Sequence, residues 1–120
     1  MSFAVPILLV DDDAGQLRVR EMILRNAGFH TIAVTSAERA LELLAGESVK
    51  LAALVTDHML PGLNGAQLVC ELRRCLPHLP VIVLTGMPGV ETEYEGLDVK
   101  IFTKPCDPEE LIEMLRQLGE

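Results

Sequence analysis

The sequence predicts an α/β protein built on a doubly wound, five-stranded parallel sheet. Short apolar runs rich in β-branched residues alternate with segments of helical spacing, which indicates the order βαβαβαβαβα. Runs that are apolar throughout suit strands covered on both faces, and right-handed crossovers place the helices on both sides of the sheet. We therefore expect a flavodoxin-like three-layer sandwich with strand order 2-1-3-4-5 and about five helices.

The expected strands follow directly from these runs. They are, in chain order, Ile7–Val10, Phe29–Val34, Leu51–Thr56, Val81–Leu84 and Val99–Thr103. In a sheet of this order, a ligand site is expected at the carboxyl ends of the first and third strands, because the strand order reverses between them.

Capping signals and glycines mark the first two helices. The first lies between Asp13 and Gly28, and this glycine is placed to end it. The second opens with Thr35–Glu38, which has the form of a capping box with Thr35 as N-cap, and Gly46 is placed to close it. Their apolar positions are Val19, Ile23 and Ala27 in the first helix, and Ala37, Ala40, Leu41 and Leu44 in the second.

The later helices are marked in the same way. Asn64 can cap a third helix that ends before Pro77, and Asp107 with Pro108 opens the last helix. Between them, residues 87–98 contain glycines and a proline with few apolar positions, so we expect a short or irregular fourth helix. The apolar positions are Leu68, Leu72 and Leu76 in the third helix, and Leu111, Leu115 and Leu118 in the last.

Composition restricts the class of protein. The 120 residues have the size of one domain, and 49% hydrophobic with 23% charged residues is typical of a globular chain. A net charge of −8 argues against direct binding to nucleic acid or to an anionic membrane. The start, Met1–Pro6, has no basic segment and so does not look like a signal peptide. A cytoplasmic location is expected.

The cysteines and histidines carry no recognisable motif. Three cysteines without metal or redox spacing do not make a disulfide framework. Cys70 and Cys75 fall within one expected helix and are interpreted as packing thiols, whereas Cys106 follows Lys104-Pro105 and is expected near the site. Histidine catalysis is not expected, because the three histidines show no ligand spacing; they are His30, His58 and His78.

Four of the strand-like runs end at residue types suited to handling phosphate. The first runs into Asp11–Asp13, the third into Asp57, the fourth into Thr85 and the fifth into Lys104. The carboxyl ends of parallel strands meet at one edge of a sheet. Each feature alone has an ordinary explanation, such as a helix cap or a solvated lysine. All four at one edge predict a site.

The residue types at this edge suggest phosphoryl transfer. Converging carboxylates repel one another and require a cation, and Mg²⁺ takes one or two carboxylates together with phosphate oxygens. Asp57 can act as a nucleophile that forms an aspartyl phosphate. Lys104 supplies a mobile cation and Thr85 a hydroxyl donor for the phosphoryl oxygens.

These motifs resemble the receiver domain of two-component response regulators. The resemblance covers essentially the whole chain and implies a single receiver domain at residues 1–120, without an output domain in this chain. The motifs are Ile7-Leu8-Leu9-Val10-Asp11-Asp12-Asp13, Asp57 with Met59-Leu60-Pro61-Gly62-Leu63-Asn64-Gly65, Leu84-Thr85-Gly86, and Lys104-Pro105.

The resemblance implies a phosphoacceptor and a magnesium site. Asp57 would accept a phosphoryl group from a phosphohistidine on a sensor histidine kinase or a phosphotransfer protein. Asp12 would bind Mg²⁺ directly and Asp11 largely through water, with Asp57 and the backbone carbonyl of Met59 as further ligands. Such a module catalyses at most its own phosphorylation and dephosphorylation, and it would signal to an unidentified output protein as a monomer or a phosphorylation-dependent homodimer.

The resemblance also assigns the phosphoryl contacts. Thr85 and Lys104 would hold the phosphoryl oxygens, and the Lys104-Pro105 bond is expected to be cis. Two departures concern the output. Ile101 stands where the family usually has a switching Tyr or Phe, and the segment from Thr85 to Lys104 is a few residues shorter than usual.

Three alternatives remain open. A phosphohydrolase of the haloacid-dehalogenase type would use Asp-x-Asp after the first strand, but Ala14-Gly15 follows in place of the usual Gly-Thr, with no room for a cap. A phosphate sink or relay would carry the same chemistry without conformational output. A flavodoxin-type module binding a nucleotide or flavin would need a phosphate-cradling loop, where this chain has three aspartates.

Overall fold

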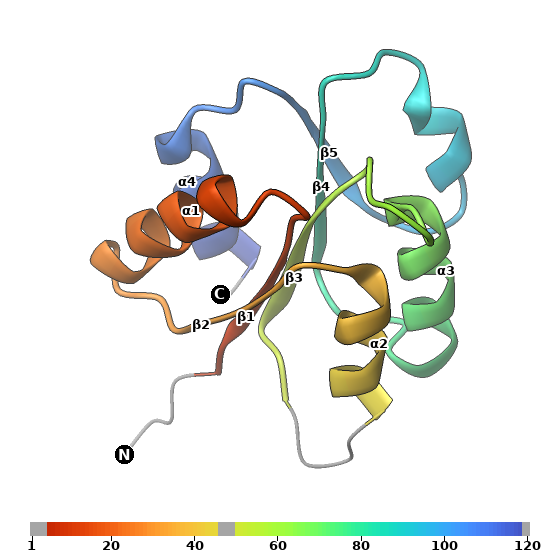
Figure 1. Cartoon of the computed structure of the whole chain (residues 1–120), viewed down its shortest axis with the longest axis horizontal. Coiled ribbons are helices and arrows are strands. Elements are labelled where there is room, and N and C mark those ends of the chain that lie inside the picture. Colours follow the sequence, from red (N-terminus) through yellow and green to blue (C-terminus); the bar gives the residue numbers. More distant parts are fainter. Residues whose placement is uncertain (1–4, 46–49, 119–120) are drawn as a thin grey trace.

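In the computed structural model, which describes residues 5–45 and 50–118, five parallel strands form one sheet in the order β2-β1-β3-β4-β5 (Figure 1). The predicted fold class and strand order are confirmed. The strands are β1 (Ile7–Val10), β2 (Thr31–Val34), β3 (Ala53–Asp57), β4 (Val81–Thr85) and β5 (Lys100–Thr103). The third and fourth strands extend one residue further than predicted, so Asp57 and Thr85 are their last residues.

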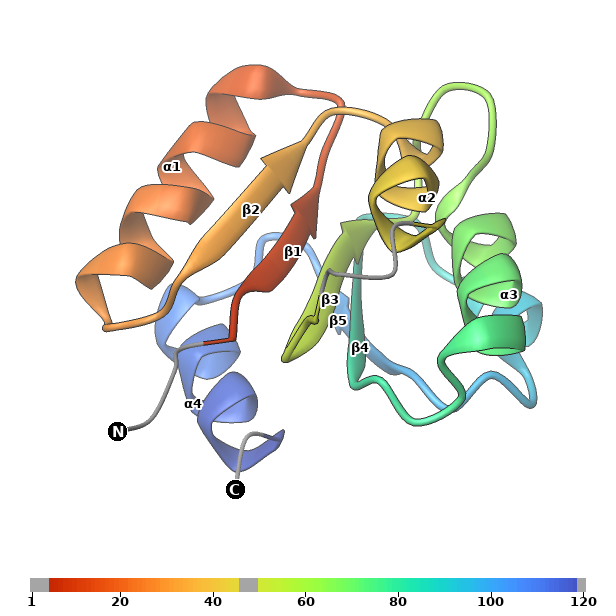
Figure 2. The same ribbon diagram turned by 90° about the horizontal axis from the view of Figure 1, so that it is seen from below.

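Four α-helices cover the sheet, two on each face. Helices α1 (Ala14–Asn26) and α4 (Pro108–Leu118) lie on one face, and α2 (Ala37–Ala45) and α3 (Gly65–Cys75) on the other (Figures 1 and 2). The expected irregular helix is the 3₁₀ helix η1 (Val90–Tyr94), so the described residues contain four α-helices rather than five. Across these described ranges, every helix is too short or too polar to cross a membrane.

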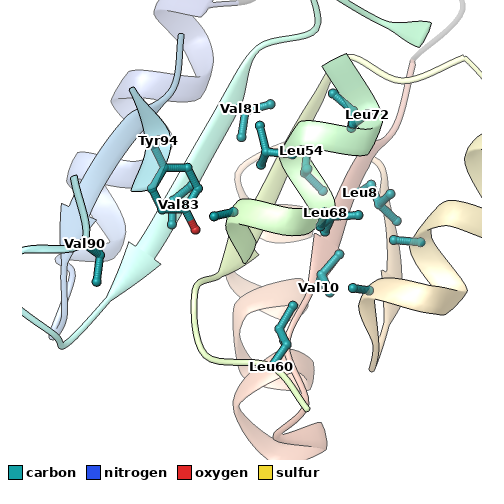
Figure 3. Packing of buried hydrophobic residues seen from close by; sticks show 14 residues of the cluster. Leu8, Val10, Leu54, Leu60, Leu68, Leu72, Val81, Val83, Val90 and Tyr94 are labelled. Carbon is teal, nitrogen blue, oxygen red and sulfur yellow. The ribbon is translucent and has the colours of Figure 1, made fainter. Parts of the chain in front are cut away.

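The core consists of two apolar clusters separated by the sheet. Leu8 and Val10 face α2 and α3, whereas Ile7 and Leu9 face α1 and α4, as the two-residue period of a strand requires. Figure 3 shows the first of these clusters, which includes the ring of Tyr94. The central strands β1, β3 and β4 are buried throughout, and the edge strands β2 and β5 only in part.

Helix α1 ends as predicted but buries a different face. Gly28 follows it with a positive φ of 100°, the usual geometry of a glycine that stops a helix. The buried side chains are Leu17 and Leu24, while Val19 is 57% exposed. Each residue turns a helix by about 100°, so Val19 lies on the side opposite Leu17. The predicted stripe through Val19 was therefore wrong.

The N-cap of α2 is Ser36 rather than the predicted Thr35. Since the helix begins at Ala37, the Ser36 hydroxyl is the one in position to accept from the Arg39 backbone N–H, at 3.1 Å. The Glu38 carboxylate faces the loop after β3, where it accepts from the Leu63 backbone N–H at 3.4 Å. The predicted stop at Gly46 lies outside the described residues.

The caps of α3 and α4 are as predicted. Asn64 and Gln67 form a reciprocal capping box, with hydrogen bonds of 2.9 and 2.8 Å. The Asp107 carboxylate accepts from the Glu109 backbone N–H at 3.0 Å, and Pro108 is the first residue of α4. These caps set where the loops at the carboxyl edge of the sheet enter each helix.

The interpretation of Cys70 and Cys75 as packing thiols was wrong. Both are exposed, because the buried face of α3 is occupied by Leu68, Val69 and Leu72. Membership of a helix does not tell which face a residue takes unless the rotation of that helix is known. Cys106 is half-buried and lies next to Lys104 in a groove described below.

Candidate functional site

The carboxyl ends of β1 and β3 bring three aspartates together. Val10 pairs with Thr56 in the sheet register, so the residues that follow them, Asp11 and Asp57, lie side by side at the carboxyl edge of the sheet. One carboxylate oxygen from each of Asp11, Asp12 and Asp57 lies within 4.8 Å of the other two. This is the edge at which the sequence predicted a site.

Asp57, the last residue of β3, is a buried carboxylate with a cation beside it. It is 4% exposed, and the Lys104 ammonium lies 2.9 Å from its Oδ1 as an ion pair. Within the described residues, Oδ1 is buried without a well-aligned hydrogen bond. Burial raises the pKa of Asp57 to about 6; Lys104 opposes this rise and the neighbouring Asp11 adds to it. The carboxylate is therefore poor in donors and suited to further positive charge.

The three consecutive aspartates have three different environments. Asp13 caps α1: its Oδ1 accepts from two backbone N–H groups in the first turn, at 3.0 and 3.1 Å. Asp12 is exposed, and among the described residues the backbone N–H groups of this loop donate to Asp11 and Asp13 but not to the Asp12 carboxylate. Asp11 is 1% exposed, and its Oδ1 accepts from the Asp13 backbone N–H at 2.9 Å. Asp12 thus has the carboxylate most available to a ligand from solvent.

Arg20 is a site residue that sequence reasoning missed. Its Nη1 lies 3.1 Å from Asp11 Oδ2, and this side chain is only 15% exposed. The ion pair neutralises a buried carboxylate that would otherwise face Asp57 unpaired. No motif pointed to Arg20, because the pairing depends on how α1 is rotated against β1.

Lys104 and Thr85 are held at the ends of β5 and β4. The Lys104 backbone N–H donates to the Thr85 carbonyl at 2.8 Å, and the Lys104-Pro105 bond is cis, as predicted. Thr85 is 3% exposed, and its Oγ1 accepts from the Met87 backbone N–H at 3.0 Å, which leaves the hydroxyl proton free for another acceptor. Met59 has a side chain that is 61% exposed, on the loop after β3.

A groove of about 680 Å³ opens beside Lys104, between α1 and α4. Val19 and Ile23, which the sequence placed on the buried stripe of α1, line this groove together with Arg20 and Cys106. Burial raises the pKa of the Cys106 thiol, and Glu110 adds to the rise, so the thiol stays protonated and weakly nucleophilic.

Behind the site, His58 and Tyr94 form a buried polar pair. His58 Nδ1 and the Tyr94 hydroxyl are 2.7 Å apart, and His58 Nε2 lies 3.4 Å from the Glu93 carboxylate. The two rings meet edge to face, with centroids 5.6 Å apart. The sequence assigned no role to either residue; the signals available were a histidine directly after Asp57 and the one tyrosine of the chain.

The residues at the edge fit a magnesium ion. The three carboxylates are hard oxygen donors, and Asp57 Oδ1 is a buried oxygen short of donors. Waters and phosphate oxygens commonly complete the shell of such an ion. Asp12 and Asp57 are the members of this cluster with an oxygen left for an ion, because Arg20 and the Asp13 backbone N–H engage the oxygens of Asp11.

A 2-1-3-4-5 sheet with aspartates, a threonine and a lysine at its carboxyl edge defines a class of response-regulator-like α/β domains. Comparison with known families agrees with this class: the model of the response regulator receiver domain matches residues 7–116. The chain therefore belongs to the response regulator receiver domain family of two-component systems. Proteins of this family are signalling modules, and their partners are in general histidine kinases.

Curated relatives are longer than this chain. The response regulator protein FleR of Pseudomonas aeruginosa is 32% identical over 93% of this chain and 24% of its own length. The response regulator MprA of Mycobacterium ulcerans is 36% identical over 96% of this chain and 50% of its own length. The chain thus spans between a quarter and a half of these relatives.

Solved structures show the same fold. A response regulator receiver protein from Sinorhizobium medicae has a TM-score of 0.86 at 33% identity, covering 97% of this chain and 94% of that one. The signal receiver domain of an HD domain-containing protein from Pseudomonas fluorescens has a TM-score of 0.88 at 26% identity, with coverages of 99% and 89%.

Proposed function

We propose that this domain accepts a phosphoryl group on Asp57 from a phosphohistidine of a histidine kinase or phosphotransfer protein, in a Mg²⁺-dependent reaction that changes partner binding. The observation that carries the proposal is the position of the Asp57 carboxylate. It lies 2.9 Å from the Lys104 ammonium and shares an acidic edge with Asp11 and Asp12, all within 4.8 Å.

In this proposal Asp57 is the nucleophile. A carboxylate oxygen attacks phosphorus, the bond from phosphorus to the imidazole nitrogen of the donor breaks, and the electron pair leaves with the imidazole. The product is an acyl phosphate. The raised pKa of Asp57, about 6, still leaves the carboxylate mostly ionised at neutral pH.

The acidic residues would hold the metal. Asp12 and Asp57 would bind Mg²⁺ through carboxylate oxygens, Met59 through its carbonyl, and Asp11 through water, since protein donors occupy both Asp11 oxygens. When bound, Mg²⁺ would neutralise charge on the phosphoryl oxygens and carboxylates. The exposure of Asp12 supports a direct ligand that an ion can reach from solvent.

Lys104 and Thr85 would hold the transferred group. The Lys104 ammonium pairs with Asp57 Oδ1 before the reaction, and it would form an ion pair with a phosphoryl oxygen afterwards. Thr85 would donate its hydroxyl proton to a second oxygen while its Oγ1 keeps the Met87 backbone N–H. The output partner would be a protein that responds to the phosphorylated form, with the domain as a monomer or a phosphorylation-dependent homodimer.

The hydrolase alternative is less well supported. In an Asp-x-Asp hydrolase, Asp13 would act as the second carboxylate of the reaction. Here the Asp13 Oδ1 already accepts two backbone hydrogen bonds as the cap of α1. A carboxylate held in this way serves the helix rather than a substrate.

The test is phosphorylation by acetyl phosphate with Mg²⁺, followed by intact mass measurement. We expect one phosphoryl adduct on the wild type and none on Asp57→Ala. Asp13→Asn is the matched control, since it changes a carboxylate of the same loop outside the proposed machinery, and it should still be labelled. An unlabelled wild type, or an undiminished adduct on Asp57→Ala, would overturn the proposal. Multiple turnovers of a phosphate ester would favour the hydrolase.

A further inference from the structure

Tyr94 joins the exposed helix η1 to the interior of the protein. It is the last residue of η1 and only 4% exposed, and its ring lies in the apolar cluster that α2 and α3 cover (Figure 3). Val90 is buried at the other end of η1, while Glu91, Thr92 and Glu93 between them are exposed. Helix η1 is therefore an acidic surface segment fixed to the core at its two ends.

The Tyr94 hydroxyl reaches the backbone behind the proposed phosphoacceptor. A Cβ placed on Gly65 would lie 2.5 Å from this hydroxyl, 2.7 Å from the Asp57 carbonyl oxygen and 2.9 Å from His58 Cα. Three groups thus converge on one point, and only glycine leaves room for them. Gly65 also donates its N–H to the His58 carbonyl at 2.8 Å, so the start of α3 is packed against the same spot.

The hydrogen bond between Tyr94 and His58 makes this contact directional. Burial raises the pKa of Tyr94 well above its ordinary value, so the hydroxyl keeps its proton. The direction of the 2.7 Å bond follows the tautomer of His58, because a hydroxyl can donate or accept. In the tautomer with its proton on Nε2, Tyr94 donates to Nδ1, and the Nε2 proton faces the Glu93 carboxylate at 3.4 Å. Separating two buried polar partners costs about 1–3 kcal/mol, so the two side chains are expected to move together.

His58 is in turn fixed to the site strand. It follows Asp57 directly, and its backbone N–H donates to the Leu84 carbonyl at 3.0 Å. A displacement at the end of β3 therefore moves the imidazole and, through its hydrogen bond, the Tyr94 ring. Ile101, which belongs to the same apolar cluster, has no ring of its own to contribute from β5.

We propose that Tyr94, held by His58, is the positioning residue that couples the state of Asp57 to the surface of η1. The proposal rests on the proposed phosphorylation of Asp57 and names the route by which it would be read. The aromatic side chain on this face of the sheet comes from η1, because the aromatic residue of β5, Phe102, packs in the cluster that α1 and α4 cover. Helix η1 is then the part of the surface whose conformation a partner would sense.

The test is the backbone amide NMR response to Mg²⁺ with beryllofluoride, an analogue that stands in for the phosphoryl group. In the wild type we expect shifts at the strand ends, near Asp57 and Thr85, and also across residues 90–95. In Tyr94→Phe the ring is kept and the hydroxyl removed. The strand-end shifts should persist, while the η1 shifts should shrink at least threefold.

Matched variants separate coupling from simple destabilisation. Glu91→Gln changes an exposed residue of η1, whereas the polar partners of His58 among the described residues are Tyr94 and Glu93, so this variant should keep the full η1 response. His58→Phe removes the ring nitrogen that bonds Tyr94 and keeps an aromatic ring, so it should lose the η1 response as Tyr94→Phe does. This second variant tests the coupling again if Tyr94→Phe folds poorly. A change that only lowers stability would not lower the η1 shift at saturating analogue.

The outcomes also separate this proposal from the one on which it rests. If the wild-type strand ends do not respond to the analogue, phosphoacceptor chemistry at Asp57 fails. If the strand ends respond and η1 stays silent in the wild type, or responds fully in both Tyr94→Phe and His58→Phe, the coupling is overturned while the proposed function stands.

Discussion

At the scale of residues, the acidic edge is a set of charges held in an unfavourable arrangement. Asp57 and Asp11 are both buried, and each has one cationic partner, Lys104 for the first and Arg20 for the second. Removing a carboxylate from water is costly even when it is paired. The burial of these two carboxylates therefore costs free energy that their ion pairs offset, an arrangement common at functional sites.

Replacing Asp57 by Asn should stabilise the metal-free domain at neutral pH. The folded pKa, about 6, lies above the ordinary 3.8, so the folded state binds more protons than the unfolded state between about pH 4 and 6. Wild-type stability should fall as pH rises through that window and stay lower above it. The shift corresponds to at most about 3 kcal/mol, and screening by solvent at the open edge reduces the expected gain of Asp57→Asn to about 1–2 kcal/mol.

Urea unfolding in EDTA at several pH values measures this gain. The curves of wild type and Asp57→Asn should coincide in midpoint near pH 4 and separate above pH 6. A constant difference at every pH would mean that the carboxylate charge is not its cause.

At the scale of elements, Arg73 ties the end of α3 to the segment before β5. Its guanidinium donates to the carbonyls of Leu97 and Leu79, each at 2.7 Å, of Asp98 at 2.9 Å and of Leu76 at 3.0 Å. Burial lowers the pKa of Arg73 without neutralising it, because a guanidinium stays charged in proteins. One side chain thus donates hydrogen bonds to carbonyl groups of two loops, which lie outside the helices and strands.

Replacing Arg73 by Met should destabilise the fold by about 2–3 kcal/mol. Methionine keeps much of the apolar stem but removes the charged donor, and a hydrogen bond to a charged group contributes a net of about 1.5–3 kcal/mol. Water can reach the released carbonyls that lie at the surface, so the total loss is smaller than the sum over four bonds. Chemical unfolding measures the loss. The matched control is Arg74→Met, since the Arg74 side chain is 75% exposed, and it should change stability by less than about 0.5 kcal/mol. Equal effects of the two variants would contradict this role of Arg73.

At the scale of the whole molecule, the sequence predicted the strand order and most features that follow from parallel-sheet geometry or from helix caps. The strand order, the caps of α3 and α4, and the meeting of Asp11, Asp57 and Lys104 at one edge follow from periodicity and from the geometry of parallel sheets. These features depend on local chain signals or on rules that hold for all such sheets.

The remaining features depend on how elements are rotated against one another. The exposure of Cys70 and of Val19, and the pairing of Asp11 with Arg20, are decided by helix rotation, which a spacing of three or four residues leaves undetermined. The contact of His58 with Tyr94 joins residues 36 positions apart through an irregular helix. No local pattern encodes such a contact.

Magnesium should stabilise the whole domain if the acidic edge binds it. A ligand present at about a hundred times its dissociation constant adds about 2.7 kcal/mol to the free energy of unfolding, which corresponds to a rise of several degrees in Tm for a domain of this size. Thermal unfolding with MgCl₂ and with EDTA measures the rise. It should be lost in Asp12→Asn, because this exposed carboxylate is the one without a protein donor in its loop. Asp13→Asn keeps an oxygen that can cap α1, so it should leave Tm nearly unchanged and keep the magnesium rise. The same rise in Asp12→Asn as in the wild type would place the ion elsewhere.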